Sequence, residues 1–245
     1  MLLKVTNPFD QSVACERAYA DDAAVDQTLA RARAAFAIWR ATPLGERIAT
    51  VARGVDAFRQ HKEAVARDVS AQMGKPLLQA RKEVDTLIDR AEQSMRTAPA
   101  ALASDVLEER DGFVRRIDHT PLGVVFDLAA WNYPLLIPTN VIVPALLAGN
   151  VVVLKHSAKT PLCGAWFARA FGELSPPGLV QDLVLTHAQT EKLLRDPRVD
   201  HVAFTGSVEG GRHVYQVASA RFVEVGLELG GKDPAYVAAD ADLDF

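Results

Sequence analysis

The sequence has little cysteine, no strong charge of either sign and no metal-ligand spacing, and each lack excludes a class of protein. Its 245 residues include only Cys15 and Cys163, so we expect no disulfide framework and a reducing, cytoplasmic location. The formal net charge of -4 gives no excess of positive charge of the kind that binds nucleic acid or an anionic membrane. The six histidines form no His-Glu-x-x-His and the cysteines no Cys-x-x-Cys, so we expect no metal site.

We also expect no targeting or membrane-spanning segment in these residues. Residues 1–8 have no apolar core of the kind found in a secretory signal. Residues 128–154 carry no formal charge, but the prolines and asparagines among them argue against one spanning helix. We expect a strand, a buried helix and a second strand there instead.

The first part, residues 1–104, is predicted to be helical. Apolar residues recur at the spacing of one helix face, which predicts helices over about 22–39, 43–58, 61–73 and 77–95. Next comes a predicted oligomerisation hairpin, residues 105–119, in which Asp111-Gly112 separates two short β-prone runs. Its flanks are charged, and two interpretations are open: a solvated surface ribbon, or an arm that pairs with a neighbouring subunit.

Strands and helices alternate in residues 120–245, which predicts an α/β fold with a doubly wound, mostly parallel sheet, Rossmann-like, and helices on both faces. The expected strands are 123–128, 151–155, 183–185, 201–204, 222–227 and 235–237. The expected helices are 134–148, 160–173, 187–196 and 207–219. Ligands of such folds lie at the carboxyl ends of the strands, so we searched those ends for chemistry.

Three strand ends carry polar groups with two possible roles each. Asn132 can donate to a developing oxyanion, or close an Asx turn. Lys155 can hold ribose hydroxyls or a phosphate, or be a solvated strand terminus. Ser207 opens a helix whose free amides suit a pyrophosphate, or is an ordinary helix cap.

The segment from Glu228 to Lys232, Glu-Leu-Gly-Gly-Lys, is the most informative one. It places a carboxylate at the end of an apolar strand, beside glycines that let another group approach the backbone. We expect this carboxylate to be partly shielded from water, which raises its pKa and makes it a usable general base. The alternative is a surface glutamate before a turn.

Together these segments resemble the NAD(P)-dependent aldehyde dehydrogenase superfamily, in order over most of the chain. The segments that carry the resemblance are Met73-Gly74-Lys75-Pro76, Pro121 to Val125 with Trp131-Asn132-Tyr133-Pro134, Lys155, Phe204-Thr205-Gly206-Ser207 and Glu228 to Lys232. The resemblance implies that a cysteine thiolate attacks an aldehyde, that hydride passes to nicotinamide, and that water hydrolyses the thioester to a carboxylic acid.

The resemblance also assigns residues to roles. Glu228 would be the general base and Asn132 the oxyanion donor. The residues implied to bind cofactor are Trp131, Lys155, Ser157, Lys159, Gly206, Ser207, Leu229 and Gly230. A small-molecule aldehyde is the implied partner, and a homo-oligomer (dimer or tetramer) the implied assembly of the full-length protein.

Two departures from the family pattern qualify this interpretation. The family's nucleophilic cysteine follows the segment at Glu228 by a few dozen residues, so residues 1–245 are expected to be the NAD(P)-binding domain without the catalytic domain, and inactive alone. A truncated nucleotide-binding module and an assembly subunit are the alternatives. In addition, Ala158 replaces a glutamate that grips the adenosine ribose in many members, and Lys159 follows it. NAD or NADP is therefore the expected cofactor, with NADP tolerated.

Overall fold

The computed structural model describes residues 2–242, and its first feature is a hairpin that the sequence did not predict. Strands β1 (Leu2–Thr6) and β2 (Val13–Ala18) pair antiparallel, and the Asn7 amide donates to the Ser12 carbonyl at 2.8 Å to close the turn. The expectation that the first hundred residues are helical is wrong for this segment. Both strands are short and only weakly buried, so their apolar pattern gives little signal.

The four predicted helices follow as expected. They are α1 (Asp22–Trp39), α2 (Leu44–Gln60), α3 (Lys62–Met73) and α4 (Leu77–Ala101). Asp21 caps α1 by accepting from the Ala24 amide at 2.7 Å. Gly74 ends α3 with a φ of 78°, a left-handed conformation that favours glycine. Helix α4 continues past the predicted end near Met95.

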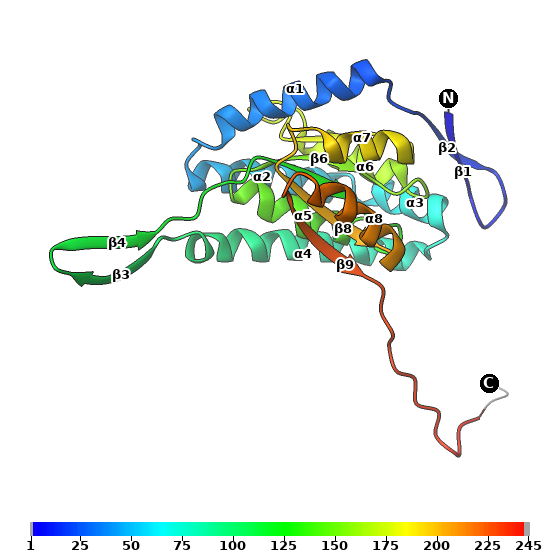
Figure 1. Cartoon of the computed structure of the whole chain (residues 1–245). Coiled ribbons are helices and arrows are strands. Elements are labelled where there is room, and N and C mark those ends of the chain that lie inside the picture. Colours follow the sequence, from blue (N-terminus) through cyan, green and yellow to red (C-terminus); the bar gives the residue numbers. More distant parts are fainter. Residues whose placement is uncertain (1, 243–245) are drawn as a thin grey trace.

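The predicted hairpin is also present. Strands β3 (Asp105–Arg110) and β4 (Phe113–Ile117) pair antiparallel around Asp111-Gly112, both with positive φ. Every residue of both strands is exposed, and the hairpin projects from the body as an arm (Figure 1).

The remainder alternates strand and helix as predicted. Its strands are β5 (Val124–Leu128), β6 (Val151–Lys155), β7 (Val180–Asp182), β8 (His201–Gly206) and β9 (Glu224–Leu229). Its helices are α5 (Leu136–Leu147), α6 (Pro161–Phe171), α7 (His187–Arg195) and α8 (Val208–Ser219). The strands form one parallel sheet in the order β7-β6-β5-β8-β9. The chain thus starts in the centre, moves to one edge, and returns to the other side of β5.

Two strand predictions need correction. The third strand of the sheet is Val180–Asp182 rather than 183–185, because Gln181 and Asp182 interrupt the apolar pattern although they pair with β6. Residues 235–237 form no strand. They lie in an extended segment that leaves the body after β9, where Tyr236 is 94% exposed and finds no strand to pair with among residues 2–242 (Figure 1).

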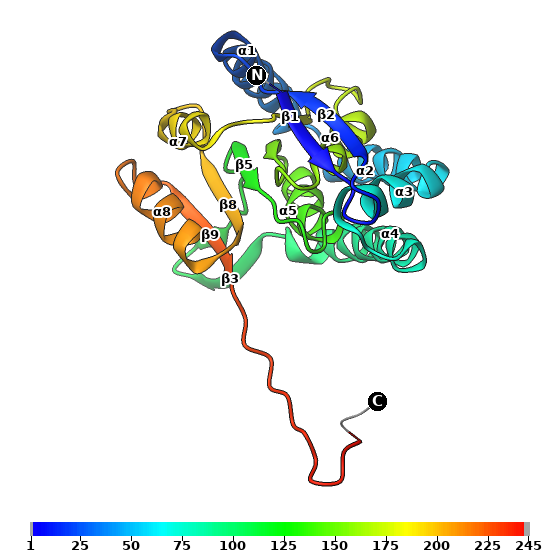
Figure 2. The same cartoon turned by 90° about the vertical axis from the view of Figure 1, so that its right-hand side faces the viewer.

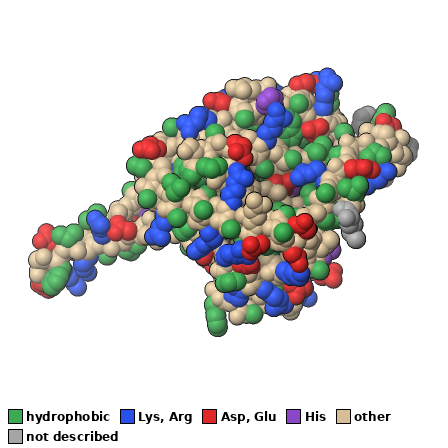
Figure 3. Space-filling model, turned by 90° about the horizontal axis from the view of Figure 1, so that it is seen from above, with side chains coloured by type: hydrophobic (Ala, Val, Ile, Leu, Met, Phe, Trp, Pro, Cys, Tyr) green, Lys and Arg blue, Asp and Glu red, His purple; other side chains and the backbone are tan. Residues whose placement is uncertain are grey.

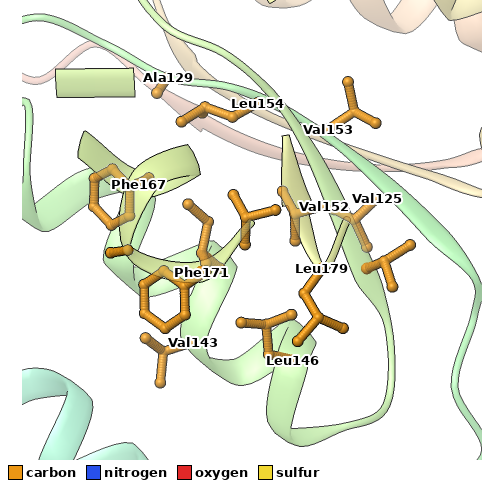
Figure 4. Packing of buried hydrophobic residues seen from close by; sticks show 14 of the residues in the cluster. Val125, Ala129, Val143, Leu146, Val152, Val153, Leu154, Phe167, Phe171 and Leu179 are labelled. Atoms are coloured by element: carbon orange, nitrogen blue, oxygen red, sulfur yellow. The ribbon is translucent and has the colours of Figure 1, made fainter. Parts of the chain in front are cut away.

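Helices cover both faces of the sheet. Helices α5 and α6 pack on one face, backed by α2, while α1, α7 and α8 lie on the other (Figure 2). Strand β6 is buried up to Leu154, and Figure 4 shows Phe167, Phe171, Val143 and Leu146 packed beside it. Such two-sided burial explains the unbroken apolar strands of the sequence. Within residues 2–242, no helix is long and apolar enough to cross a membrane.

Candidate active site

A cleft runs along the carboxyl ends of β5, β6, β8 and β9. Its volume is about 1010 Å³. All ten site residues predicted from the sequence line it: Trp131, Asn132, Lys155, Ser157, Lys159, Gly206, Ser207, Glu228, Leu229 and Gly230. They meet because the ends of parallel strands fall at one edge of the sheet, on both sides of the point where the strand order reverses between β5 and β8.

The segment after β5 brings Asn132 to the cleft. Asn132 is exposed, and the buried Pro134 and Leu135 follow it before α5 begins. Residues of other segments fix its backbone. His156 contacts the Pro134 carbonyl at 2.9 Å, and the Leu135 amide donates to Glu83 at 2.8 Å. The Asn132 side chain is thereby carried into the cleft by a fixed backbone.

Lys155 ends β6 and is half-buried at the floor of the cleft. Burial lowers the pKa of its ammonium group, since the charged form loses hydration. Its carbonyl accepts from the Ala129 amide at 3.2 Å, which joins the ends of β5 and β6.

The loop after β6 adds a second cation. The Lys159 ammonium lies 4.3 Å from the centre of the Trp131 ring, within the range of a cation–π contact. Ser157 accepts from the Lys159 amide at 3.2 Å and shapes this turn. One wall of the cleft is therefore positive, with Ala158 between the serine and the lysine.

Helix α8 points its N-terminus at the cleft. Ser207 caps it by accepting from the Gly210 amide at 3.1 Å, and other first-turn amides have no intrahelical acceptor. A Cβ on Gly206 would lie 2.7 Å from the Phe204 ring, and one on Gly210 would lie 2.9 Å from it. These glycines let Phe204 pack beneath the helix start, so they shape the end of the helix that faces the cleft.

Glu228 reaches the cleft from β9, but it is exposed, contrary to the expected shielding from water. Strand β9 is the edge strand, and its residues alternate between exposed and half-buried. Glu228 pairs in register with Thr205, and the Gly230 amide donates to the Gly206 carbonyl at 3.3 Å. The turn after the carboxylate is therefore anchored even though the carboxylate is solvated.

Sequence reasoning missed several lining residues, among them Thr186, His187 and Thr205. Thr186 caps α7 in a capping box with Gln189, each side chain bonding the other residue's backbone. A threonine followed three residues later by glutamine signals this helix start. This helix start also opens on the cleft.

A second, smaller hollow of about 250 Å³ lies between α7 and α8. It shares Lys155, His187 and Ser207 with the cleft. Its apolar lining is Leu128, Ala129, Leu194, Phe204 and Val214. Because they share these residues, the two hollows adjoin and together form one groove, whose smaller part carries the apolar lining.

Neither cysteine belongs to this groove. Cys163 is fully buried in α6, where burial raises the pKa of its thiol well above the usual value. Cys15 lies in β2, and burial raises its pKa as well. Within residues 2–242, no cluster of three or more His, Cys, Asp or Glu side chains is placed to hold a metal ion.

Comparison with known proteins identifies the family. The model of the aldehyde dehydrogenase family matches residues 1–245. N-succinylglutamate 5-semialdehyde dehydrogenase 1 of Caulobacter vibrioides is 34% identical over 240 residues, 97% of this chain and 51% of its own length.

Solved structures agree with this. Succinic semialdehyde dehydrogenase from Streptococcus pyogenes, in complex with NADP+, has a TM-score of 0.88 at 28% identity, over 99% of this chain and 53% of its own. An NAD-dependent benzaldehyde dehydrogenase from Corynebacterium glutamicum also has a TM-score of 0.88, at 30% identity, over 100% of this chain and 54% of its own. The chain spans about half the length of the curated relatives it matches. It belongs to the aldehyde dehydrogenase family.

Proposed function

We propose that this chain forms the cofactor-binding part of an enzyme that oxidises an aldehyde to a carboxylic acid with NAD+ or NADP+. The observation that carries the proposal is the one cleft that Asn132 and Glu228 share with Lys155 and Ser207. Along it lie side chains suited to be an oxyanion donor, a base and a ribose-binding cation, together with a helix start suited to bind an anion.

The residues fit a dinucleotide. The free amides of α8 beside Ser207 suit a pyrophosphate, because the helix N-terminus carries partial positive charge. Lys155, which lines the cleft, would hold ribose hydroxyls, and the apolar hollow beside Phe204 suits a flat adenine ring. The bound nicotinamide would supply the acceptor for the hydride that leaves the aldehyde carbon.

The reacting end of the cleft would hold Asn132 and Glu228. The Asn132 amide donates to the oxygen that becomes negative when the carbonyl is attacked. The Glu228 carboxylate accepts a proton from the nucleophile or from the water that releases the acid. In the proposed thiohemiacetal and thioester route the thiol is neither Cys15 nor Cys163, because both lie outside the cleft. It has to reach the cleft from outside residues 1–245.

The positive wall supports the use of NADP as well as NAD. Ala158 brings no carboxylate near a 2′-phosphate, and Lys159 brings a cation. One structural relative was solved with NADP+ and another is NAD-dependent, so the fold serves both cofactors.

The arm formed by β3 and β4 supports self-association as a dimer or tetramer. Val106, Phe113 and Val114 are 73%, 68% and 79% exposed along it. Hydrophobic and charged side chains alternate on the arm where it stands clear of the body (Figure 3). Unpaired strand edges with apolar side chains favour pairing with another chain.

Calorimetric titration with NAD+ and with NADP+ tests the proposal. We expect binding of both, and weaker binding by at least about tenfold on replacing Lys155→Ala, about 1.4 kcal/mol. Lys192→Ala removes an exposed lysine of α7 that pairs with Asp22, and should leave affinity unchanged. Binding of neither cofactor would contradict the proposal. Binding without aldehyde oxidation when a family thiol is present would favour a nucleotide-binding module.

A further inference from the structure

A buried ion pair lies directly behind the segment that carries Asn132. Lys75, between α3 and α4, pairs with Glu83 of α4, and their side chains are 10% and 2% exposed. Charges this deep are costly unless paired and hydrogen-bonded, so a pair here requires further partners.

The partners are backbone groups of the Asn132 segment. The Lys75 ammonium donates to the Asn132 carbonyl at 3.0 Å. The other Glu83 oxygen accepts from the amides of Leu135 and Leu136 at 2.8 and 3.3 Å. The pair therefore holds the segment at both ends, on the peptide group of Asn132 and at the start of α5.

A ring contact adds to this hold. The Lys75 ammonium lies 4.3 Å from the centre of the Tyr133 ring, on the residue after Asn132. Glu83 alone would be explained as a cap for α5, whose N-terminus favours a carboxylate. A helix cap does not account for Lys75, which contacts the Asn132 peptide rather than the helix.

We propose that Lys75 and Glu83 are positioning residues that fix the Asn132 backbone so that its amide faces the reacting carbonyl oxygen; this rests on the proposed function. An oxyanion donor acts only where it is already in place, and a displacement of about 1 Å can lower a rate by about 100-fold. Lys75 and Glu83 stay behind the segment and do not line the cleft.

Hydrogen exchange on this chain gives the first test. In Lys75→Met, exchange of amides in 132–136 should become faster by at least about tenfold, while the central sheet stays protected. Lys75→Arg, which keeps the charge and the donors, should restore most of the protection. The double variant Lys75→Met/Glu83→Gln removes both charges, so that no unpaired charge is left buried. Where the single variant folds poorly, exchange in 132–136 is measured in this double variant instead.

A matched control lies on the same helices. Lys62 donates to Asp85 at 2.6 Å between α3 and α4, but this pair is exposed and far from Asn132 in sequence. Lys62→Met should leave exchange in 132–136 unchanged. Equal exchange in wild type and Lys75→Met, or faster exchange spread evenly over the sheet, would overturn the proposal.

Turnover gives the second test, on the protein in which this chain works together with the catalytic thiol. Lys75→Met should lower kcat by about 10- to 100-fold and leave cofactor affinity within about twofold. In an Asn132→Ala background the same change should cost nothing further, since the donor it positions is gone. If the two substitutions together lowered kcat by the product of their separate effects, Lys75 would act by a route that does not involve Asn132. A wild-type protein without any aldehyde oxidation would refute the proposed function, while hydrogen exchange would still decide whether the pair fixes the segment.

Discussion

The Arg17 guanidinium donates to the Asp182 carboxylate at 3.1 Å, and this contact ties the N-terminal hairpin to the edge of the parallel sheet. Arg17 also donates to the Pro161 carbonyl at 3.0 Å, at the start of α6. The Asp182 side chain is nearly fully buried, and one of its oxygens, Oδ1, has no hydrogen-bond partner among residues 2–242. Desolvation therefore outweighs the attraction of Arg17 and raises the Asp182 pKa to about 6.

The raised pKa of Asp182 predicts a stability that falls as pH rises. Between its ordinary pKa of 3.8 and about 6, the folded state binds more protons than the unfolded state. About two pKa units correspond to about 3 kcal/mol, lost as pH rises through this window. In urea unfolding at several pH values, the stability of Asp182→Asn relative to wild type should therefore rise by this amount as pH rises from about 4 to 6, because only the wild type carries the Asp182 carboxyl. Parallel pH profiles of the two proteins would contradict it.

His156 predicts the opposite slope in an overlapping window. Both ring nitrogens are engaged, at 2.9 Å to the Pro134 carbonyl and 3.1 Å to the Thr160 hydroxyl, and burial lowers the pKa to about 4. The unfolded state binds more protons below the ordinary pKa of 6.5, so stability is lost as pH falls toward 4.

The His156 effect amounts to about 3 kcal/mol and largely offsets that of Asp182. We expect His156→Gln to be less stable near neutral pH but to lose less stability on acidification than wild type. Urea unfolding at matched pH values measures this. If the variant lost as much stability on acidification as the wild type, a neutral, buried imidazole would be contradicted.

Ala158→Glu is predicted to change cofactor choice. The new carboxylate would face a 2′-phosphate beside Lys159, and like charges repel most where water is partly excluded. We expect the NADP+ affinity to fall by at least about tenfold and the NAD+ affinity to stay or improve. The same substitution at the exposed Ala41, outside the cleft, should alter neither. Equal losses for both cofactors in Ala158→Glu would contradict the placement of the 2′-phosphate.

Gly54→Ala tests how closely α2 and α6 pack. A Cβ at Gly54 would lie 2.1 Å from the buried ring of Phe171, which Figure 4 shows inside the core. We expect a loss of about 1–3 kcal/mol in the free energy of unfolding. Gly45, on the same helix, has no described residue within 4 Å of its Cβ position, and Gly45→Ala should be neutral or stabilise by up to about 1 kcal/mol. Thermal or urea unfolding of the two variants distinguishes steric overlap from helix propensity.

The sequence predicted most of the fold because its signals are local. Apolar runs such as Val151 to Leu154 mark strands buried on both faces, and Gly74 marks a helix end. The prediction failed where the strand signal was weak, at β1 and β2, or where polar residues stood in a strand, at Asp182. It also failed at 235–237, because a β-prone run forms a strand only where another strand can pair with it.

By itself the sequence determined that Asn132, Lys155, Ser207 and Glu228 would meet at one edge of a sheet, since parallel strands all end on the same side, and the family resemblance added the other six site residues. Only the tertiary structure decided what lies around them. Lys75 and Asn132 are 57 residues apart, and Arg17 and Asp182 are 165 apart, distances over which no local pattern specifies a partner. The exposure of Glu228 likewise follows from the position of β9 at the sheet edge, which depends on the order of strands in space and not on their order in the chain.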